Sequence, residues 1–251
     1  VARAGQLGVV SGTALDVILA RRLQVGDPCG SMRRALAQFP LKDAAQRILD
    51  RYFVAGGKPV DAPFKSKPMP SANPSRDAEE LLVVGNFVEV FLAREGHSNP
   101  IGINFLEKIQ TPTLPSIFGA MLAGVSCILM GAGIPRAIPG ILDKLARGEP
   151  VELTLDVVGA KPGETFVTRF DPKPYWPADL YTLRRPEFYA IVSSATLANM
   201  LAKKPSGKVD GFIVEGPTPG GHNAPPRGPM QLTSGGEPIY GPRDVPDLEA
   251  I

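Results

Sequence analysis

The sequence predicts an α/β protein of the (β/α)8 TIM-barrel type, incomplete, with about five barrel strands and a small β-hairpin excursion. Short runs of β-branched and apolar residues alternate with helical patterns, which is typical of βα units that form a parallel sheet. The 251 residues match the size of one barrel, which takes about 250 residues. Small or polar residues follow each predicted strand, as at barrel active sites. We therefore treat residues 1–251 as one partial barrel domain.

The amino-terminal part of the chain contains one predicted strand followed by helices. Leu7–Ser11 is a short apolar strand, and Leu15–Leu23 after it shows a helical pattern. Ser31–Ala55 carries further helical patterning, whereas the prolines of Gly56–Pro74 predict a loop. Apolar residues spaced along one face predict a helix over Ala78–Glu95.

The middle of the chain adds two βα units and a hairpin. Ile101–Leu106 and Cys127–Met130 are predicted strands, and predicted helices over Ser116–Ala123 and Ala137–Arg147 follow them. Residues 151–170 alternate apolar and polar side chains on both sides of the sequence AKPG. This alternation predicts an antiparallel hairpin that is an excursion from the barrel.

The carboxyl-terminal part supplies two more strands and a long loop. Tyr189–Ser193 and Gly211–Glu215 are predicted strands, with a predicted helix over Ala195–Lys203 between them. Residues 217–251 form a loop rich in proline and glycine, within which Val245–Ile251 looks like the start of the next helix. Because a barrel of this type closes with eight strands, we interpret the chain as a fragment that lacks material at both ends.

Composition excludes several classes of function. The formal net charge is +2 and no basic stripe is interleaved with aromatic residues, which argues against a nucleic-acid partner. Two histidines cannot build a histidine-rich zinc site, and the two cysteines have no metal-type spacing. Glycines interrupt the most apolar stretch, Ile117–Ile134, so we expect no membrane span. We expect a soluble, cytoplasmic protein that acts on a small molecule.

Small and polar residues gather at the predicted carboxyl ends of the strands. In βα proteins these ends meet at one edge of the sheet, where ligands bind. Glycines there let the backbone approach a flat or phosphorylated ligand, although a single glycine after a strand is most often a turn residue. The residues in question are Ser11, Gly12, Asn104, Gly131, Ser193 and Glu215.

The sharpest local signal is Gly220-Gly221-His222, which comes shortly after the last predicted strand. Two glycines let the backbone pass against a flat ring, and an imidazole there can take up a proton near neutral pH. The alternative interpretation is an ordinary histidine in a surface loop rich in proline and glycine.

Val209–Gly228 (VDGFIVEGPTPGGHNAPPRG) resembles the strand and GGH segment of the nitronate monooxygenase family, formerly called 2-nitropropane dioxygenases. Flavin-dependent enoyl-acyl-carrier-protein reductases share this segment. Four further segments are similar to those of the nitronate monooxygenases and occur in the same order, so the resemblance covers most of the chain. They are Ala4–Gly12, Pro100–Leu106, Ala123–Pro135 and Phe188–Leu201.

The resemblance implies flavin mononucleotide (FMN) as the cofactor and His222 as the catalytic base. Asn104 matches a polar contact to the isoalloxazine ring, and Glu215 matches an acidic or polar neighbour of the flavin. Gly220 and Gly221 match backbone contacts to FMN. The implied cofactor-binding residues are Asn104, Gly131, Ser193, Glu215, Gly220 and Gly221.

The implied reaction is the oxidation of alkyl nitronates or nitroalkanes by O2 to a carbonyl compound and nitrite. Two alternatives stay open: an FMN-dependent enoyl-thioester reductase that uses NAD(P)H, and an inactive barrel fragment or binding module. The chain departs from the family pattern because the first-strand glycine-methionine loop and the two phosphate-binding strand ends are absent. The 151–170 hairpin and the sequence NAPPRG are additions relative to short family members.

Overall fold

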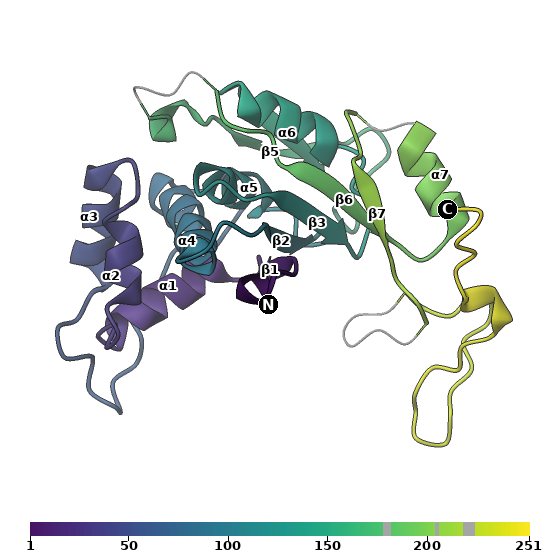
Figure 1. Ribbon diagram of the computed structural model, residues 1–251, viewed down its shortest axis with the longest axis horizontal. Helices are drawn as coiled ribbons and strands as arrows, with labels where there is room; N and C mark the ends of the chain where they lie inside the picture. Colours follow the sequence, from purple (N-terminus) through teal and green to yellow (C-terminus); the bar gives the residue numbers. More distant parts are fainter. Residues whose placement is uncertain (178–181, 204–205, 218–223) are drawn as a thin grey trace.

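The computed structural model describes residues 1–177, 182–203, 206–217 and 224–251 and confirms an α/β fold built on one parallel sheet (Figure 1). Its five strands pair in the order β1-β2-β3-β6-β7. Every predicted barrel strand is confirmed. The strands are β1 (Gly8–Ser11), β2 (Ile101–Leu106), β3 (Cys127–Gly131), β6 (Glu187–Val192) and β7 (Gly211–Val214).

Each strand of the sheet pairs in parallel with the next strand of the sheet along the chain. One row of register partners runs from Val10 through Ile103 and Ile128 to Phe188. The last three of these side chains are fully buried, so this row crosses the middle of the core. Within the described residues β1 and β7 each have one strand neighbour. The sheet seen here is therefore open, and closure into a barrel stays a prediction.

The helices predicted between Leu15 and Lys203 are confirmed, with one subdivision. Ser31–Ala55 contains two helices because Pro40 interrupts the pattern and disfavours helical geometry at the residue before it. The α-helices of the described residues are α1 (Leu15–Gln24), α2 (Ser31–Leu36), α3 (Lys42–Tyr52), α4 (Arg76–Arg94), α5 (Thr113–Leu122), α6 (Ile138–Ala146) and α7 (Ala195–Lys203).

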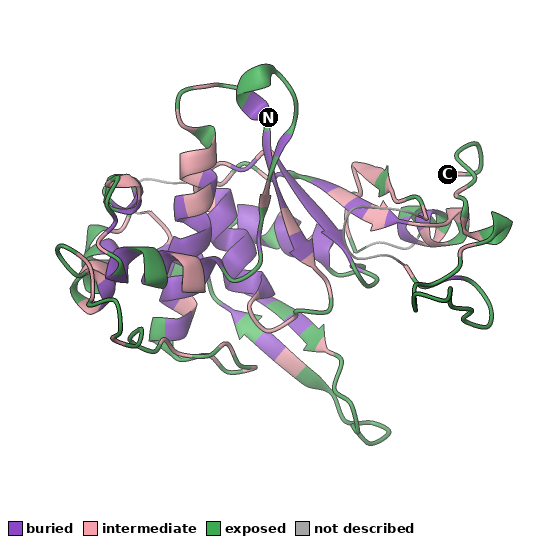
Figure 2. Ribbon diagram, turned by 90° about the horizontal axis from the view of Figure 1, so that it is seen from below, coloured by how far each residue is buried: buried purple, intermediate pink, exposed green. Residues whose placement is uncertain are grey.

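Helix α4 is the centre of the helical layer, and two glycines let its neighbours approach it closely. A Cβ on Gly85 of α4 would lie 2.9 Å from the carbonyl oxygen of Leu15 in α1. A Cβ on Gly119 of α5 would collide with the Val83 carbonyl group of α4. These contacts explain why glycine, a poor helix former, stands inside two helices. Figure 2 shows the buried residues concentrated in these helices and in the strands beside them.

The predicted hairpin is confirmed as β4 (Val151–Leu155) and β5 (Phe166–Phe170), which pair antiparallel outside the main sheet. One face is packed inward, because Val151, Leu153 and Phe170 are buried. The Phe170 ring lies 5.4 Å from the ring of Phe118 in α5, measured between centroids. The tip of the hairpin is exposed, as Figure 2 shows.

The prediction that a helix begins within Val245–Ile251 stays a prediction. The structure has a 3-10 turn at Pro242–Asp244 and a second turn at residues 248–250. Asp247 Oδ1 accepts hydrogen bonds from the backbone N–H groups of Glu249 and Ala250, at 3.1 and 3.2 Å, as the residue before the first turn of a helix does.

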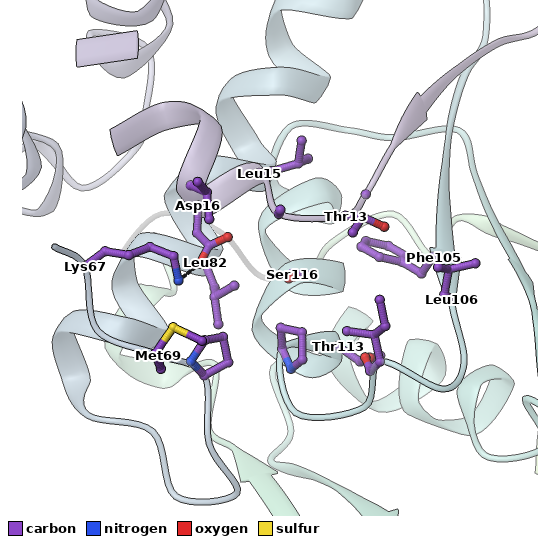
Figure 3. A pocket seen from close by; sticks show the side chains of 16 residues that line it. Thr13, Leu15, Asp16, Lys67, Met69, Leu82, Phe105, Leu106, Thr113 and Ser116 are labelled. Carbon is purple, nitrogen blue, oxygen red and sulfur yellow. Dashed lines mark hydrogen bonds and ion pairs between the residues drawn. The ribbon is translucent and has the colours of Figure 1, made fainter. Parts of the chain in front are cut away.

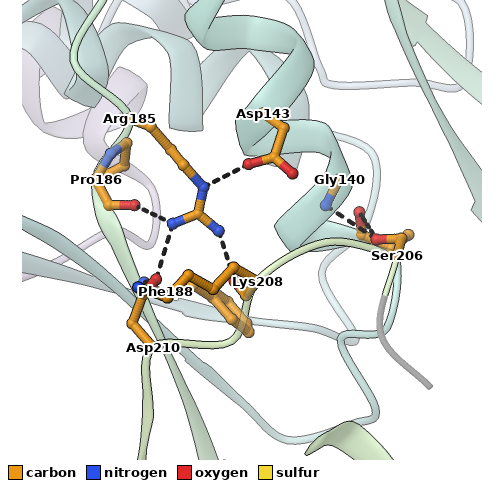
Figure 4. Close-up of polar contacts among 9 residues, drawn as sticks. Gly140, Asp143, Arg185, Pro186, Phe188, Ser206, Lys208 and Asp210 are labelled. Carbon is orange, nitrogen blue, oxygen red and sulfur yellow. Dashed lines mark hydrogen bonds and ion pairs between the residues drawn. The ribbon is translucent and has the colours of Figure 1, made fainter. Parts of the chain in front are cut away.

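Arg185 ties the amino-terminal ends of β6 and β7 to α6 (Figure 4). Its guanidinium donates to Asp143 of α6 at 2.5 Å, to Asp210 before β7 at 2.8 Å and to the carbonyl oxygen of Lys208 at 2.5 Å. Asp210 also accepts from the backbone N–H of Phe188 at 2.9 Å. The cluster lies at the edge of the sheet opposite to the strand ends where ligands bind in this class of fold, so we assign it to stability.

Asp210 gives this cluster a pH dependence. Burial alone would raise the pKa of Asp210, but hydrogen bonds from Lys208, the Phe188 N–H and Arg185 outweigh it and lower the pKa. A carboxyl group whose pKa is lowered by folding stabilises the fold above its unfolded pKa of about 3.9. That stability is lost as the pH falls below this value towards the folded pKa.

We predict that Asp210→Asn lowers the free energy of unfolding by about 2 kcal/mol at pH 7, since a hydrogen-bonded charge is lost. The difference from wild type should shrink as the pH falls below about 4. Urea unfolding at pH 7 and at a pH below about 4 measures the free energy of unfolding of both proteins. The matched control is Asp61→Asn, at an exposed position. A difference that does not change with pH would contradict the assignment.

Candidate functional site

A cavity of about 650 Å³ lies at the carboxyl edge of the sheet. This volume is within the range of roughly 300–1,000 Å³ that is typical of small-molecule and cofactor sites. Residues from the ends of all five strands of the sheet line it. Four of the sequence-predicted site residues therefore share one cavity, although their roles as flavin contacts stay predictions. They are Asn104, Gly131, Ser193 and Glu215.

Backbone hydrogen bonds continue past the strand ends and fix the loops that line the cavity. The N–H of Gly12 donates to the carbonyl oxygen of Asn104, and the N–H of Glu107 donates to that of Gly131, each at 2.8 Å. The N–H of Glu215 donates to the carbonyl oxygen of Val192 at 2.8 Å. The lining is thus an extension of the sheet, and the position of each strand end is set by its neighbour.

Asn104 contributes an unused hydrogen-bond acceptor. It stands in β2 between its register partners Ser11 and Leu129. Its Oδ1 is buried and has no hydrogen-bond partner within the described residues. Leaving such an atom unpaired costs about 1–3 kcal/mol, and such exceptions are often functional. A ligand N–H or O–H in the cavity would satisfy it.

The turn after β3 holds the backbone close to two neighbours. A Cβ on Gly131 would lie 2.8 Å from the Cβ of Ile191 in β6. Ala132 has a left-handed backbone with φ 54°, which is strained for a residue other than glycine. A Cβ on Gly133 would collide with the Glu107 carboxylate, and burial raises the pKa of that carboxyl. This crowding leaves room for small residues only along this wall of the cavity.

The carboxyl-terminal loop supplies the outer wall. Ala224 and Pro225 line the cavity. The side chain of Arg227 donates to the carbonyl oxygen of Ser193 at 3.0 Å, and its backbone N–H donates to Asp244 at 2.8 Å. This attachment could not be predicted from the sequence, because the partners are far apart along the chain.

Sequence reasoning also missed two polar lining residues, Thr13 and Lys108. Among the described residues that line the cavity, Lys108 is the basic one and Glu215 the acidic one. Both missed residues lie two positions beyond a strand end. Extending the search from the last strand residue into the following turn would have found them.

Gly220, Gly221 and His222 lie outside the described residues. The described residues on the two sides of this segment, Glu215 and Ala224, both line the cavity. The sequence segment that carries GGH therefore connects two points of the cavity lining.

Two features are absent from the described residues. Among residues 1–177, 182–203, 206–217 and 224–251, no group of three or more His, Cys, Asp or Glu side chains is placed to hold a metal ion. None of the helices in these ranges is long and apolar enough to cross a membrane.

Comparison of the chain with known protein families, curated proteins and solved structures gives no match.

We predict that Gly131→Ala lowers the free energy of unfolding by about 1–3 kcal/mol, because the new methyl group collides with Ile191 in a packed wall. Urea unfolding measures the loss. The control is Gly235→Ala, where the nearest atom to a new Cβ is 3.7 Å away. Equal stability of the two variants would show that the wall is not close-packed at Gly131.

Proposed function

We propose that this chain carries the flavin-facing site of an FMN-dependent oxidoreductase that resembles the nitronate monooxygenases. The reaction is the oxidation of alkyl nitronates or nitroalkanes by O2 to a carbonyl compound and nitrite. The observation that carries the proposal is the cavity at the carboxyl edge, into which all five strands of the sheet contribute residues. The GGH segment follows the last of these strands in the sequence.

The strand order supports a barrel as the complete architecture. Doubly wound sheets reverse their strand order at a switch point, where the ligand binds. In a barrel each strand instead pairs with the next one along the chain. The order β1-β2-β3-β6-β7 has no reversal, since β4 and β5 form the separate hairpin. We therefore propose a (β/α)8 barrel in which β1 and β7 pair with further strands.

The described residues fit FMN. The volume of the cavity suits a ligand of this size. The pyrimidine edge of the isoalloxazine carries an N–H group between two carbonyl groups. This N–H can donate a hydrogen bond to the unpaired Oδ1 of Asn104. Lys108 offers a positive charge to the same cavity. When bound, FMN supplies the electron acceptor for the oxidation.

The residues of the chain then bind, orient and deprotonate the substrate. Ile191 and Leu197 give the cavity an apolar wall that excludes water from the reacting carbon. His222 removes the proton from the carbon next to the nitro group of a nitroalkane, since an imidazole has an ordinary pKa near 6.5. A nitronate has already lost this proton and does not need the base.

We predict that His222→Ala lowers the rate on a neutral nitroalkane by about 10²–10⁴-fold, the usual contribution of a general base. The rate on the matching nitronate should change little. Nitrite release from both substrates by the FMN-loaded protein measures this. His97→Gln, at the other histidine of the chain, is the control. Unchanged nitroalkane turnover in His222→Ala would remove His222 from the mechanism.

The two alternatives are separated by direct measurements. An enoyl-thioester reductase would oxidise NADH with a crotonyl thioester and release no nitrite from nitronates. A binding module without redox chemistry would turn over neither substrate, and a protein purified without flavin absorbance would favour it.

A further inference from the structure

A second cavity, of about 220 Å³, shares lining residues with the first. Figure 3 shows it from close by. It is enclosed by the start of α1, the end of β2, the start of α5 and the loop between α3 and α4. Its lining is mainly hydrocarbon, with Leu15, Met69, Leu82, Phe105, Leu106 and Ile109 among the side chains. The hydroxyl of Thr113 donates to the carbonyl oxygen of Ile109, so this polar group is already satisfied.

The loop that forms the outer wall is anchored by specific contacts. Lys67 and Asp16 of α1 form an ion pair at 2.6 Å, with side chains only 13% and 6% exposed (Figure 3). The Gln24 side chain accepts from the backbone N–H of Lys65 at 2.6 Å. These contacts anchor the loop that carries the lining residues Met69 and Pro70, of which Met69 is 77% exposed. The cavity is therefore a built feature of the fold.

The two cavities share Thr13 and Leu106 in their linings. Leu106 is the last residue of β2 and the register partner of Gly131, which lines the larger cavity. The two cavities are therefore adjacent, with Thr13 and Leu106 at their common boundary.

We propose that the smaller cavity holds the unbranched alkyl tail of the substrate, while the reacting carbon lies in the larger cavity; this rests on the proposed function. The lining selects a hydrocarbon because its charged members, Asp16 and Lys67, are paired with each other. A charged tail would find no partner there. At about 30 Å³ for each methylene-sized group, the volume holds a chain of about seven carbons.

The test measures kcat/KM for nitrite release from 1-nitroalkane nitronates of increasing length with the FMN-loaded protein. Each methylene that enters the cavity should raise kcat/KM about fourfold. The rise should stop once the tail exceeds about seven carbons, when the cavity is full. A flat series with measurable turnover overturns the inference and leaves the proposed function standing.

Ser116→Leu tests the location of the tail, because Ser116 is a buried residue of α5 that lines the smaller cavity. The added side chain should abolish the length dependence and leave the shortest nitronate unaffected. Ser66→Leu adds the same side chain at an exposed position of the loop and should behave as wild type. A length dependence that survives Ser116→Leu, in protein with normal FMN content, overturns the inference.

Binding of octanoate and propanoate, measured by calorimetry, separates the inference from the reaction. A carboxylate resembles a nitronate in carrying one negative charge on two oxygens, and it does not react. If wild type binds octanoate more tightly than propanoate, and Ser116→Leu loses this difference, the tail site is supported. This holds even if no nitronate is oxidised, and in that case only the proposed function fails. Equal binding of both acids, together with no turnover, overturns both.

Discussion

The parallel hydrogen-bond ladder of the five strands is the constraint on which the rest of the structure depends. Parallel pairing brings all carboxyl ends to one edge, and the continued backbone bonds at Gly12, Glu107 and Glu215 fix where each loop begins. The cavity at the strand ends exists because of this alignment. A shift of one residue in any strand would turn its inward side chains to the opposite face and remove its contribution to the lining.

The two edges of the sheet differ in how their polar groups are paired. The Arg185 cluster satisfies its charges at the amino-terminal edge, where Asp143 and Asp210 accept its hydrogen bonds. The carboxyl edge instead leaves the buried Oδ1 of Asn104 unpaired and keeps Ala132 in a strained backbone conformation. Other buried atoms of the described residues also lack a partner, among them Nδ1 of His97, so the position of Asn104 in the cavity lining is what links its free acceptor to a ligand.

The sequence predicted the elements well because each is encoded locally. Buried runs such as Ile101–Leu106 and the alternation in residues 151–170 depend only on neighbouring side chains. Contacts between distant segments carry no such periodic signal, so the Lys67–Asp16 ion pair and the smaller cavity that it helps to enclose were not predicted. A helix that begins within Val245–Ile251 stays a prediction, since the structure shows a single turn after Asp247.

The affinity of the protein for FMN, compared between wild type and Asn104→Leu by flavin fluorescence, tests the proposed flavin site most directly. We expect wild type to bind FMN. We expect Asn104→Leu to bind it more weakly, by a factor of about ten, because a side chain of similar size no longer accepts a hydrogen bond. Equal affinity of the two proteins, or no binding of FMN by either, would contradict the claim that the carboxyl-edge cavity is a flavin site.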